Sequence, residues 1–167
     1  MKSQRAFTLI ELVMVIALLG ILAVASFVAI GSFQSQHLNA AAERVAADLR
    51  YAKNLALTKT VWHGVIYNTG TEVYEIYQTD GTTDTLIKKP EDLNQDFSVD
   101  LDNDYDGVGI SSADIDSGSK VEFDPYGVPF TDKNGNAITS VGIITLSGGG
   151  SSVTVRIAPE TGRVYIQ

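Results

Sequence analysis

The sequence predicts an α+β protein in which a long N-terminal α-helix precedes antiparallel β-sheets. Two observations place the helix: residues 7–33 carry a single charged side chain, and residues 34–59 contain no proline or glycine and repeat apolar residues at three- or four-residue steps. A third observation places the sheets, because short β-rich segments alternate with Gly- and Pro-containing turns from residue 60 onward. At 167 residues, the chain has room for one ordinary domain and one additional element.

The apolar run over residues 7–33 forms the first half of the predicted helix. Its 27 residues would extend about 40 Å as an α-helix, against a bilayer hydrocarbon core of about 30 Å. An ordinary secretory signal peptide has an apolar core of roughly 7–15 residues, so the length favours a transmembrane helix. A cleaved signal peptide and a plain membrane anchor are the two alternatives. Because Lys2 and Arg5 precede the run, we expect the N-terminus to be cytoplasmic and the globular part to be periplasmic.

Glu11 is the single charged residue within this apolar run. An ionisable side chain in a membrane-spanning segment is unfavourable and marks a functional position by default. Because Glu11 has no partner nearby in the sequence, we expect a positive charge from another molecule to compensate it.

Residues 6–12, Ala-Phe-Thr-Leu-Ile-Glu-Leu, resemble the processing site of type IV prepilins and type II secretion pseudopilins. The resemblance implies that residues 1–6 are a leader, that a membrane peptidase cuts between Ala6 and Phe7, and that the new Phe7 amine is N-methylated. It also implies that Glu11 pairs with the Phe7 amine of a neighbouring subunit during assembly.

The sequence departs from this family at two positions. Ala6 stands where the family usually has Gly, and Val28 stands where many major pilins have Pro. Gly20 matches a position at which the family often carries Gly, so it is predicted to serve assembly. Small residues recur at three-residue steps and would permit the close approach of another helix. The alternative is that they are ordinary residues of an apolar segment with no specific role in packing. They are Ala17, Gly20, Ala23, Ser26 and Ala29.

Residues 34–59 form the amphipathic second half of the predicted helix, which we expect to run from about residue 7 to residue 58. One face carries apolar residues, namely Leu38, Ala42, Val45, Leu49, Ala52 and Ala56. The polar part consists of Glu43, Arg44, Asp48, Arg50 and Lys53. The apolar face is predicted to pack against a sheet.

Residues 60–167 are predicted to form a β-rich globular domain. The expected strands are 61–67, 72–78, 86–89, 97–101, 120–123, 142–147, 152–157 and 163–166, with a hairpin turn at 68–71. Residues 49–57, 123–127 and 162–166 resemble segments of the GspH/FimT-type minor pseudopilins. That resemblance implies a long helix packed on an antiparallel β-sandwich.

The net charge of −8 is concentrated in one segment. Residues 91–116 hold nine Asp or Glu and no Lys or Arg. This argues against a broad nucleic-acid surface, which needs a basic patch, so no nucleic-acid partner is expected. The absence of cysteine excludes disulfides and thiolate metal sites.

Within this acidic segment, residues 102–107 match the first half of a calcium loop. Asp102, Asp104 and Asp106 would be ligands, with Asp114 supplying the late carboxylate because the twelfth loop position is occupied by Ala113. Calcium is the one cofactor predicted, and a solvated acidic loop is the alternative.

The remaining residues give no pattern of catalysis. His37 and His63 are isolated and are expected at the surface or at a sheet edge, and no nucleophile motif or P-loop occurs. The aromatic residues Trp62, Tyr67, Tyr74 and Tyr77 are expected to pack within and across strands.

Together, these observations predict a non-enzymatic assembly subunit. The first interpretation is a minor pseudopilin of a type II secretion system, and the alternative is a minor type IV pilin acting in pilus assembly, adhesion or DNA uptake. The expected partners are a prepilin peptidase/methylase and other pilins or pseudopilins. The expected location is the bacterial inner membrane, with a single transmembrane pass, followed by a filament.

Overall fold

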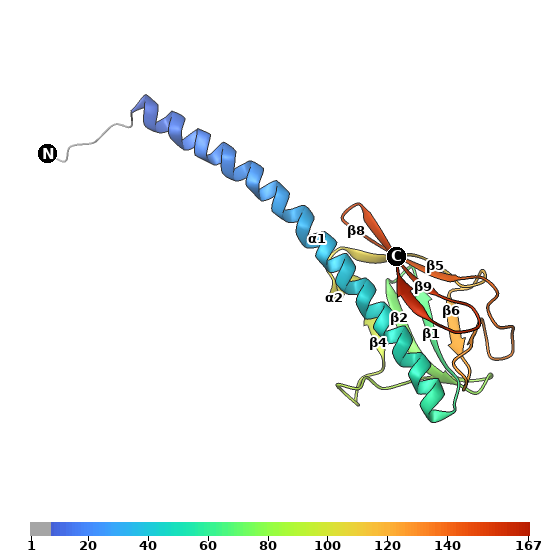
Figure 1. Cartoon of the computed structure of the whole chain (residues 1–167). Helices are drawn as coiled ribbons and strands as arrows, with labels where there is room; N and C mark the ends of the chain where they lie inside the picture. The colour runs from blue at the N-terminus through green and yellow to red at the C-terminus, as the bar shows by residue number, and fades with distance from the viewer. Residues whose placement is uncertain (1–7) are drawn as a thin grey trace. The chain divides into compact units, whose positions relative to one another are not determined.

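The computed structural model describes residues 8–167, except for the side chains of residues 24–33 (Figure 1). Its elements follow in the order of one long helix, four strands, one short helix and six further strands. The chain divides into two units, residues 1–33 and residues 34–167.

Helix α1, Leu9–Lys59, confirms the single long helix predicted from periodicity. It continues through residues 34–59 because this stretch lacks helix breakers and places its apolar residues on one face. The helix ends where Thr60 adopts a left-handed conformation with φ of 57°, the conformation that commonly follows the last helical residue. The hydroxyl of Thr58 donates to the carbonyl oxygen of Asn54 in the last turn.

In the described part of the chain, no helix is both long and apolar enough to cross a bilayer. The span expected over residues 7–33 includes Phe7 and the side chains of residues 24–33, which lie outside the described residues.

The larger sheet contains six strands and is antiparallel throughout. Its strands are β1 (His63–Asn68), β2 (Val73–Thr79), β3 (Asp84–Leu86), β4 (Ser98–Asp100), β6 (Lys120–Phe123) and β7 (Pro129–Phe130). Their order is β3-β2-β1-β6-β7, and β4 also pairs with β2. Strands β3 and β4 pair with different parts of β2, since Tyr77 is opposite Leu86 and Val73 is opposite Asp100.

The smaller sheet has four antiparallel strands in the order β10-β9-β8-β5. These are β5 (Val108–Asp114), β8 (Gly142–Gly148), β9 (Ser151–Ile157) and β10 (Val164–Ile166). Residues of β8 alternate between buried and half-buried, as expected for a strand with one face in the core. The observed architecture is therefore α+β with antiparallel sheets, as the sequence predicted.

Two tight turns explain how neighbouring strands pair. In the β1–β2 turn, the side-chain oxygen of Asn68 accepts hydrogen bonds from the backbone nitrogens of Gly70 and Thr71. In the β8–β9 turn, Gly149 and Gly150 have φ of 59° and 78° between the paired residues Gly148 and Ser151. Positive φ at both central residues is the requirement of a type I′ hairpin, which glycine meets without strain.

The core lies between the second half of α1 and the two sheets. The predicted apolar face of the helix is confirmed, because its six residues are at most 2 % exposed. Five of the buried helical residues are alanines, and their small side chains allow the helix to lie close to the sheets. These are Ala41, Ala42, Ala46, Ala52 and Ala56.

Three elements were not predicted from sequence: β5, β7 and the short helix α2 (Leu101–Asp104). Strand β5 contains glycine, serine and aspartate, which favour strands weakly, and its register shifts between Ile110 and Ser112. Pairing with β8 and a hydrogen bond from the Ile110 nitrogen to the Glu72 carboxylate hold β5 in place. Both contacts join residues that are far apart in sequence.

Candidate functional site

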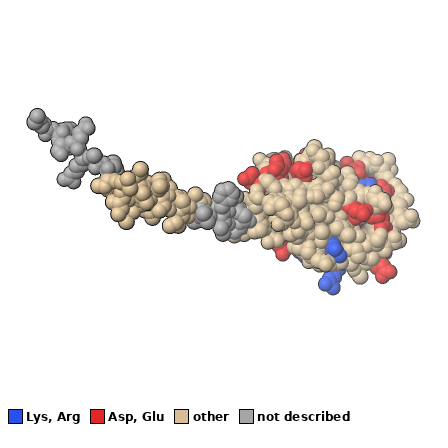
Figure 2. All heavy atoms as spheres, turned by 90° about the horizontal axis from the view of Figure 1, so that it is seen from above, with Lys and Arg blue, Asp and Glu red and all other residues tan. Residues whose placement is uncertain are grey.

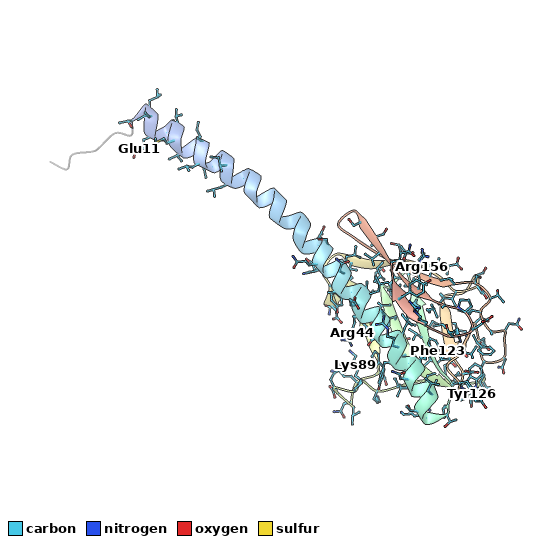
Figure 3. The ribbon with its side chains drawn as sticks, in the orientation of Figure 1. Glu11, Arg44, Lys89, Phe123, Tyr126 and Arg156 are labelled. Carbon is cyan, nitrogen blue, oxygen red and sulfur yellow. The ribbon has the colours of Figure 1, made fainter. Side chains whose placement is uncertain are left out.

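The start of α1 carries the residues that the sequence assigned to assembly (Figure 3). Thr8 precedes the first helical residue, and its hydroxyl and carbonyl oxygens accept hydrogen bonds from the Glu11 nitrogen at 3.3 Å and 3.1 Å. Thr8 and Glu11 therefore have the spacing of a helix-capping pair. The Thr8 bonds use the Glu11 backbone, so capping by Thr8 does not need the carboxylate. A carboxylate in the first turn also interacts favourably with the helix dipole.

The described side chains that follow form an apolar surface around the whole helix. Eleven large apolar residues between positions 9 and 22 are exposed, from 45 % for Val15 to 82 % for Leu9. Five of them occupy the consecutive positions 12–16, which point in all directions around a helix with about 3.6 residues per turn. Such a helix requires an apolar environment on every side, which either lipid or other helices can supply.

Gly20 is the second residue that the sequence predicted to serve assembly. A Cβ added to Gly20 would meet no described atom within 4 Å. Packing among the described residues therefore gives no reason for glycine at this position, whereas close approach by a second helix would. The predicted cleavage and methylation positions, Ala6 and Phe7, lie outside the described residues.

Comparison with known proteins bears directly on this segment. Residues 1–27 match the family described as the prokaryotic N-terminal methylation motif. The structure is similar to the crystal structure of the type IV minor pilin FimU of Pseudomonas aeruginosa, with a TM-score of 0.53. The sequence identity is 12 %, and the match covers 78 % of this chain and 92 % of FimU. The chain is prepilin-like.

The prepilin-like chain shares its fold with FimU, and at this level of identity the likeness concerns the fold alone. A second crystal form of FimU gives a TM-score of 0.49 at 14 % identity, covering 80 % of this chain and 90 % of FimU. No curated protein matches the sequence. The methylation motif and the fold are independent findings, since the motif ends at residue 27 and the sheets begin at His63.

The structure does not bring together the four acidic residues predicted to bind calcium. Within the described residues, no group of three His, Asp or Glu side chains is arranged to hold a metal ion. Asp100 caps α2 by accepting from the Asn103 nitrogen at 3.1 Å, so Asp102 and Asp104 stand on a helical turn. Residues two apart on a helix do not face each other. The distant fourth candidate, Asp114, accepts from the Ser117 nitrogen at 3.0 Å, and calcium binding stays a prediction.

A buried polar cluster at the junction of helix and sheet was missed by sequence reasoning. Asp48, which the sequence placed on the polar part of the helix, is 7 % exposed. Its Oδ2 accepts from the Tyr74 hydroxyl at 2.5 Å and from Arg44 Nε at 2.8 Å. Burial and the Asp48 carboxylate raise the pKa of Tyr74. The available signal was the position of Asp48, three residues after Val45 on the apolar face.

The outer face of the larger sheet contains a second buried carboxylate. Glu122 is 1 % exposed; its Oε1 accepts from the Tyr77 hydroxyl at 2.8 Å and from Lys120 Nζ at 3.0 Å. Its Oε2 accepts from the Lys133 nitrogen at 2.6 Å. Desolvation lowers the pKa of Lys120, but its hydrogen bonds to Asp132 and Glu122 outweigh this effect, so the pKa is raised overall. Both carboxylate oxygens of Glu122 therefore have hydrogen-bond partners, and the role of the cluster is structural.

His63 corrects a prediction, whereas His37 confirms one. His37 is exposed as expected, but His63 is fully buried at the start of β1. Its Nδ1 lies 2.7 Å from the Val61 carbonyl oxygen, and its Nε2 has no hydrogen-bond partner among the described residues. Desolvation lowers the pKa of His63. The prediction failed because β1 is an interior strand, paired with both β2 and β6.

Proposed function

We propose that this chain is a structural subunit that enters a filament through its N-terminal helix. The observation that carries the proposal is the exposed apolar surface of residues 9–22, a segment that includes Glu11 and lies within the methylation motif. A helix with this surface is stable in lipid, and it is equally stable against other helices of the same kind. The subunit can therefore move from the membrane into a helical bundle without exposing apolar surface to water.

Maturation prepares this transfer. A prepilin peptidase/methylase would remove residues 1–6 and methylate the Phe7 amine, in agreement with the motif over residues 1–27. The new amine is a cation at the start of the helix, and Glu11 is an anion about one turn away. In a bundle, the Glu11 carboxylate of one subunit meets the Phe7 amine of its neighbour. Pairing removes the cost of two isolated charges in an apolar environment.

The location follows from the same segment. Residues 7–33 would anchor the precursor in the bacterial inner membrane as a single pass. Lys2 and Arg5 would stay in the cytoplasm, and residues 60–167 would lie in the periplasm. The work of the subunit is assembly, and no enzymatic step is assigned to it.

The machine that contains the subunit is proposed to be a type II secretion pseudopilus, in which the chain is a minor pseudopilin. A minor type IV pilin is the second candidate, and the fold that the chain shares with FimU fits this candidate as well as the first. Deleting the gene distinguishes them: a pseudopilin loss should stop secretion of exoproteins and leave surface pili intact, whereas a pilin loss should reduce surface pili alone. Unchanged secretion and unchanged piliation would contradict both assignments.

A further inference from the structure

A basic groove with a volume of about 360 Å³ lies between the last turns of α1 and the turn before β10. Lys53 Nζ donates to the Thr161 carbonyl oxygen at 2.6 Å, and Arg50 Nη2 donates to the Val164 carbonyl oxygen at 3.2 Å. These bonds hold the turn against the helix and position the two cations. The side chains that line the groove include Arg50, Lys53, Asn54, Leu57 and Arg163.

The polar side chains of the basic groove mainly donate hydrogen bonds. Lysine has three N–H donors and arginine has five, and neither has an acceptor, so Lys53 and Arg50 keep donors beyond those used within the chain. Asn54 adds a side-chain amide, and no Asp or Glu lines the groove. A group with several acceptor oxygens and a negative charge is the complement of such a surface. Carboxylates and phosphates are the two groups of this kind.

The three cations of the basic groove make no ion pair with any described residue. The ion pairs among the described residues involve Arg44, Lys88 and Lys120 as their cations. Figure 2 shows acidic side chains spread over much of the visible face of the domain and basic side chains at only a few places. A chain with a net charge of −8 therefore gathers three positive charges at one groove without using them in ion pairs. This charge is available to a partner.

Exposed aromatic and apolar residues border the basic groove, which favours a protein as the partner. Tyr126 is 85 % exposed on the turn after β6, and Leu57 is 42 % exposed on α1 (Figure 3). The turn reaches the groove through Gly127, where an added Cβ would lie 2.8 Å from Lys53 Cε and 3.3 Å from Leu57 Cδ2. Tyrosine and arginine are enriched at protein interfaces and among the residues that dominate binding energy. The composition therefore fits a protein surface that carries carboxylates.

The position of the basic groove argues against the two sources of phosphate. Lys53 follows Gln34, the first residue of the globular unit, by 19 positions on α1, which corresponds to about 28 Å along a helix. The groove therefore lies at the end of the domain that is remote from the entry of the helix, and the proposed membrane segment precedes that entry. Lipid headgroups are disfavoured for this reason. Nucleic acid is disfavoured because three cations on an acidic chain offer few phosphate contacts.

We propose that the basic groove binds carboxylates on the globular domain of a different, non-identical subunit of the same filament. The inference rests on the proposed function and names the surface through which this chain selects its neighbour. A minor subunit is outnumbered by other subunits, so most surfaces next to it belong to chains of different sequence. Arg50, Lys53 and Arg163 meet the carboxylates of that neighbour, while Leu57 and Tyr126 exclude water at the border. Complementary charges of this kind decide which partner binds and in which register.

Carbodiimide crosslinking tests the contact directly, because it joins only amines and carboxylates that touch. The full-length chain and the other prepilins of the same cells, each with its own tag, are expressed with the assembly machinery, and the membranes are treated with a water-soluble carbodiimide. The reagent activates a carboxylate, an amide bond forms between the lysine nitrogen and the carboxyl carbon, and one carboxyl oxygen leaves on the reagent as a urea. Mass spectrometry should find a peptide in which Lys53 is joined to an Asp or Glu of another prepilin.

A charge reversal beside this lysine makes the test specific. Arg163→Glu leaves the Lys53 amine in place but repels carboxylates, so the yield of the linked peptide should fall roughly tenfold. Lys89→Glu is the matched control, because Lys89 lies between β3 and β4, outside the groove, and should leave the yield unchanged. Replacing the linked carboxylate of the partner by lysine should restore its co-purification with the Arg163→Glu chain. An unchanged yield in Arg163→Glu would overturn the proposal.

The identity of the linked protein decides among the other occupants. If Lys53 is linked only to a second copy of this chain, or to a protein outside the filament, the proposed partner is wrong. If Lys53 forms no link, the groove does not bind carboxylates in the assembly. Binding of double-stranded DNA or of phosphatidylglycerol vesicles that is lost in Arg163→Glu, without any link from Lys53, would assign the groove to phosphate and overturn the proposal.

The same samples separate this inference from the proposed function. Co-purification of the tagged chain with other filament subunits reports the assembly role, since the N-terminal helix supports it independently of the groove. If the wild-type chain co-purifies with them but Lys53 is never linked to a carboxylate of another subunit, this inference is wrong and the filament role stands. If the chain never co-purifies with filament subunits, the proposed function itself fails.

Discussion

The hydroxyl of Tyr74, on the central strand pair, donates a 2.5 Å hydrogen bond to Oδ2 of Asp48 on the helix. Arg44 Nε donates to the same oxygen at 2.8 Å, and the hydrogen bond from Arg44 to Asp48 raises the pKa of the guanidinium. This contact ties α1 to the larger sheet at a fixed position along the helix. A polar tie of this kind sets the register of packing, whereas the alanines of the apolar face would tolerate small shifts.

Tyr74→Phe removes this tie and leaves the remaining packing unchanged. A hydrogen bond to a charged group contributes about 1.5–3 kcal/mol, so the free energy of unfolding should fall by about that amount. Urea unfolding of residues 34–167, which contain all of the buried core residues, measures the change. Tyr126→Phe is the matched control, because Tyr126 is 85 % exposed and should show no loss. Equal stability of Tyr74→Phe and the wild type would show that the bond contributes nothing.

Gly64 is predicted to be intolerant of any side chain. A Cβ at this position would lie 2.6 Å from Tyr77 Cζ and 2.8 Å from Glu122 Cγ, and both of these side chains are buried in a hydrogen-bonded cluster. Gly64→Ala must displace them, at a cost of about 1–3 kcal/mol. The midpoint of thermal unfolding should therefore fall. Gly70→Ala serves as the control, since its nearest neighbour, Asn68 Oδ1, is 3.4 Å away. A thermal midpoint equal to that of Gly70→Ala would refute this account of Gly64.

His63 should make the domain less stable as pH falls. Burial lowers its pKa in the folded state below the ordinary value of 6.5, so the unfolded chain binds a proton at a higher pH than the folded chain does. The neutral histidine therefore costs no stability above pH 6.5, and stability is lost as pH falls below that value. Denaturant unfolding between pH 7.5 and pH 5 measures this slope. His63→Gln should flatten the slope, whereas His37→Gln, at an exposed position, should not change it. If the dependence of stability on pH remains in His63→Gln, another titratable group causes it.

The N-terminal processing prediction concerns Phe7. We expect the mature chain to begin at N-methylated Phe7, because residues 1–27 match the methylation motif and the basic leader directly precedes this residue. Mass spectrometry of the N-terminal peptide from membranes checks both the cut and the added methyl group. Ala6→Gly, which restores the usual residue before the cut, should be processed at least as fast. A mature chain that starts at Met1, or after residue 33, would contradict the prepilin interpretation.

Glu11 is predicted to be needed for assembly and dispensable for membrane insertion. Glu11→Leu removes a carboxylate that opposes insertion, and the Thr8 hydrogen bonds use only the Glu11 backbone. The variant should therefore fractionate with membranes at least as well as the wild type, while its crosslinking to other filament subunits is lost. Thr8→Val, which removes the capping hydroxyl and keeps the carboxylate, is the control and should still assemble. Normal assembly of Glu11→Leu would show that pairing between the Glu11 carboxylate and the Phe7 amine of a neighbouring subunit is not required.

Sequence periodicity alone was enough to predict the long helix, its buried face and most of the strands. These features depend on residues that are near one another in the chain: apolar side chains three and four apart, and a hairpin turn closed by Asn68. The leader motif was equally readable, since it is a short contiguous segment of the chain. The arrangement of the two sheets could not be predicted from local patterns alone, because β5 has few strand-forming residues and depends on pairing with β8.

What the sequence by itself determined is therefore the local pattern: a helix with an apolar first half, an amphipathic second half, and a prepilin-type start. Only the tertiary structure decided that Asp48 and His63 are buried, that Asp102 and Asp104 stand on a helical turn, and that Arg50, Lys53 and Arg163 share one groove. Burial and charge clustering depend on contacts between residues far apart in the chain. Those contacts form when strands and helix pack together, and no local pattern of residues encodes them.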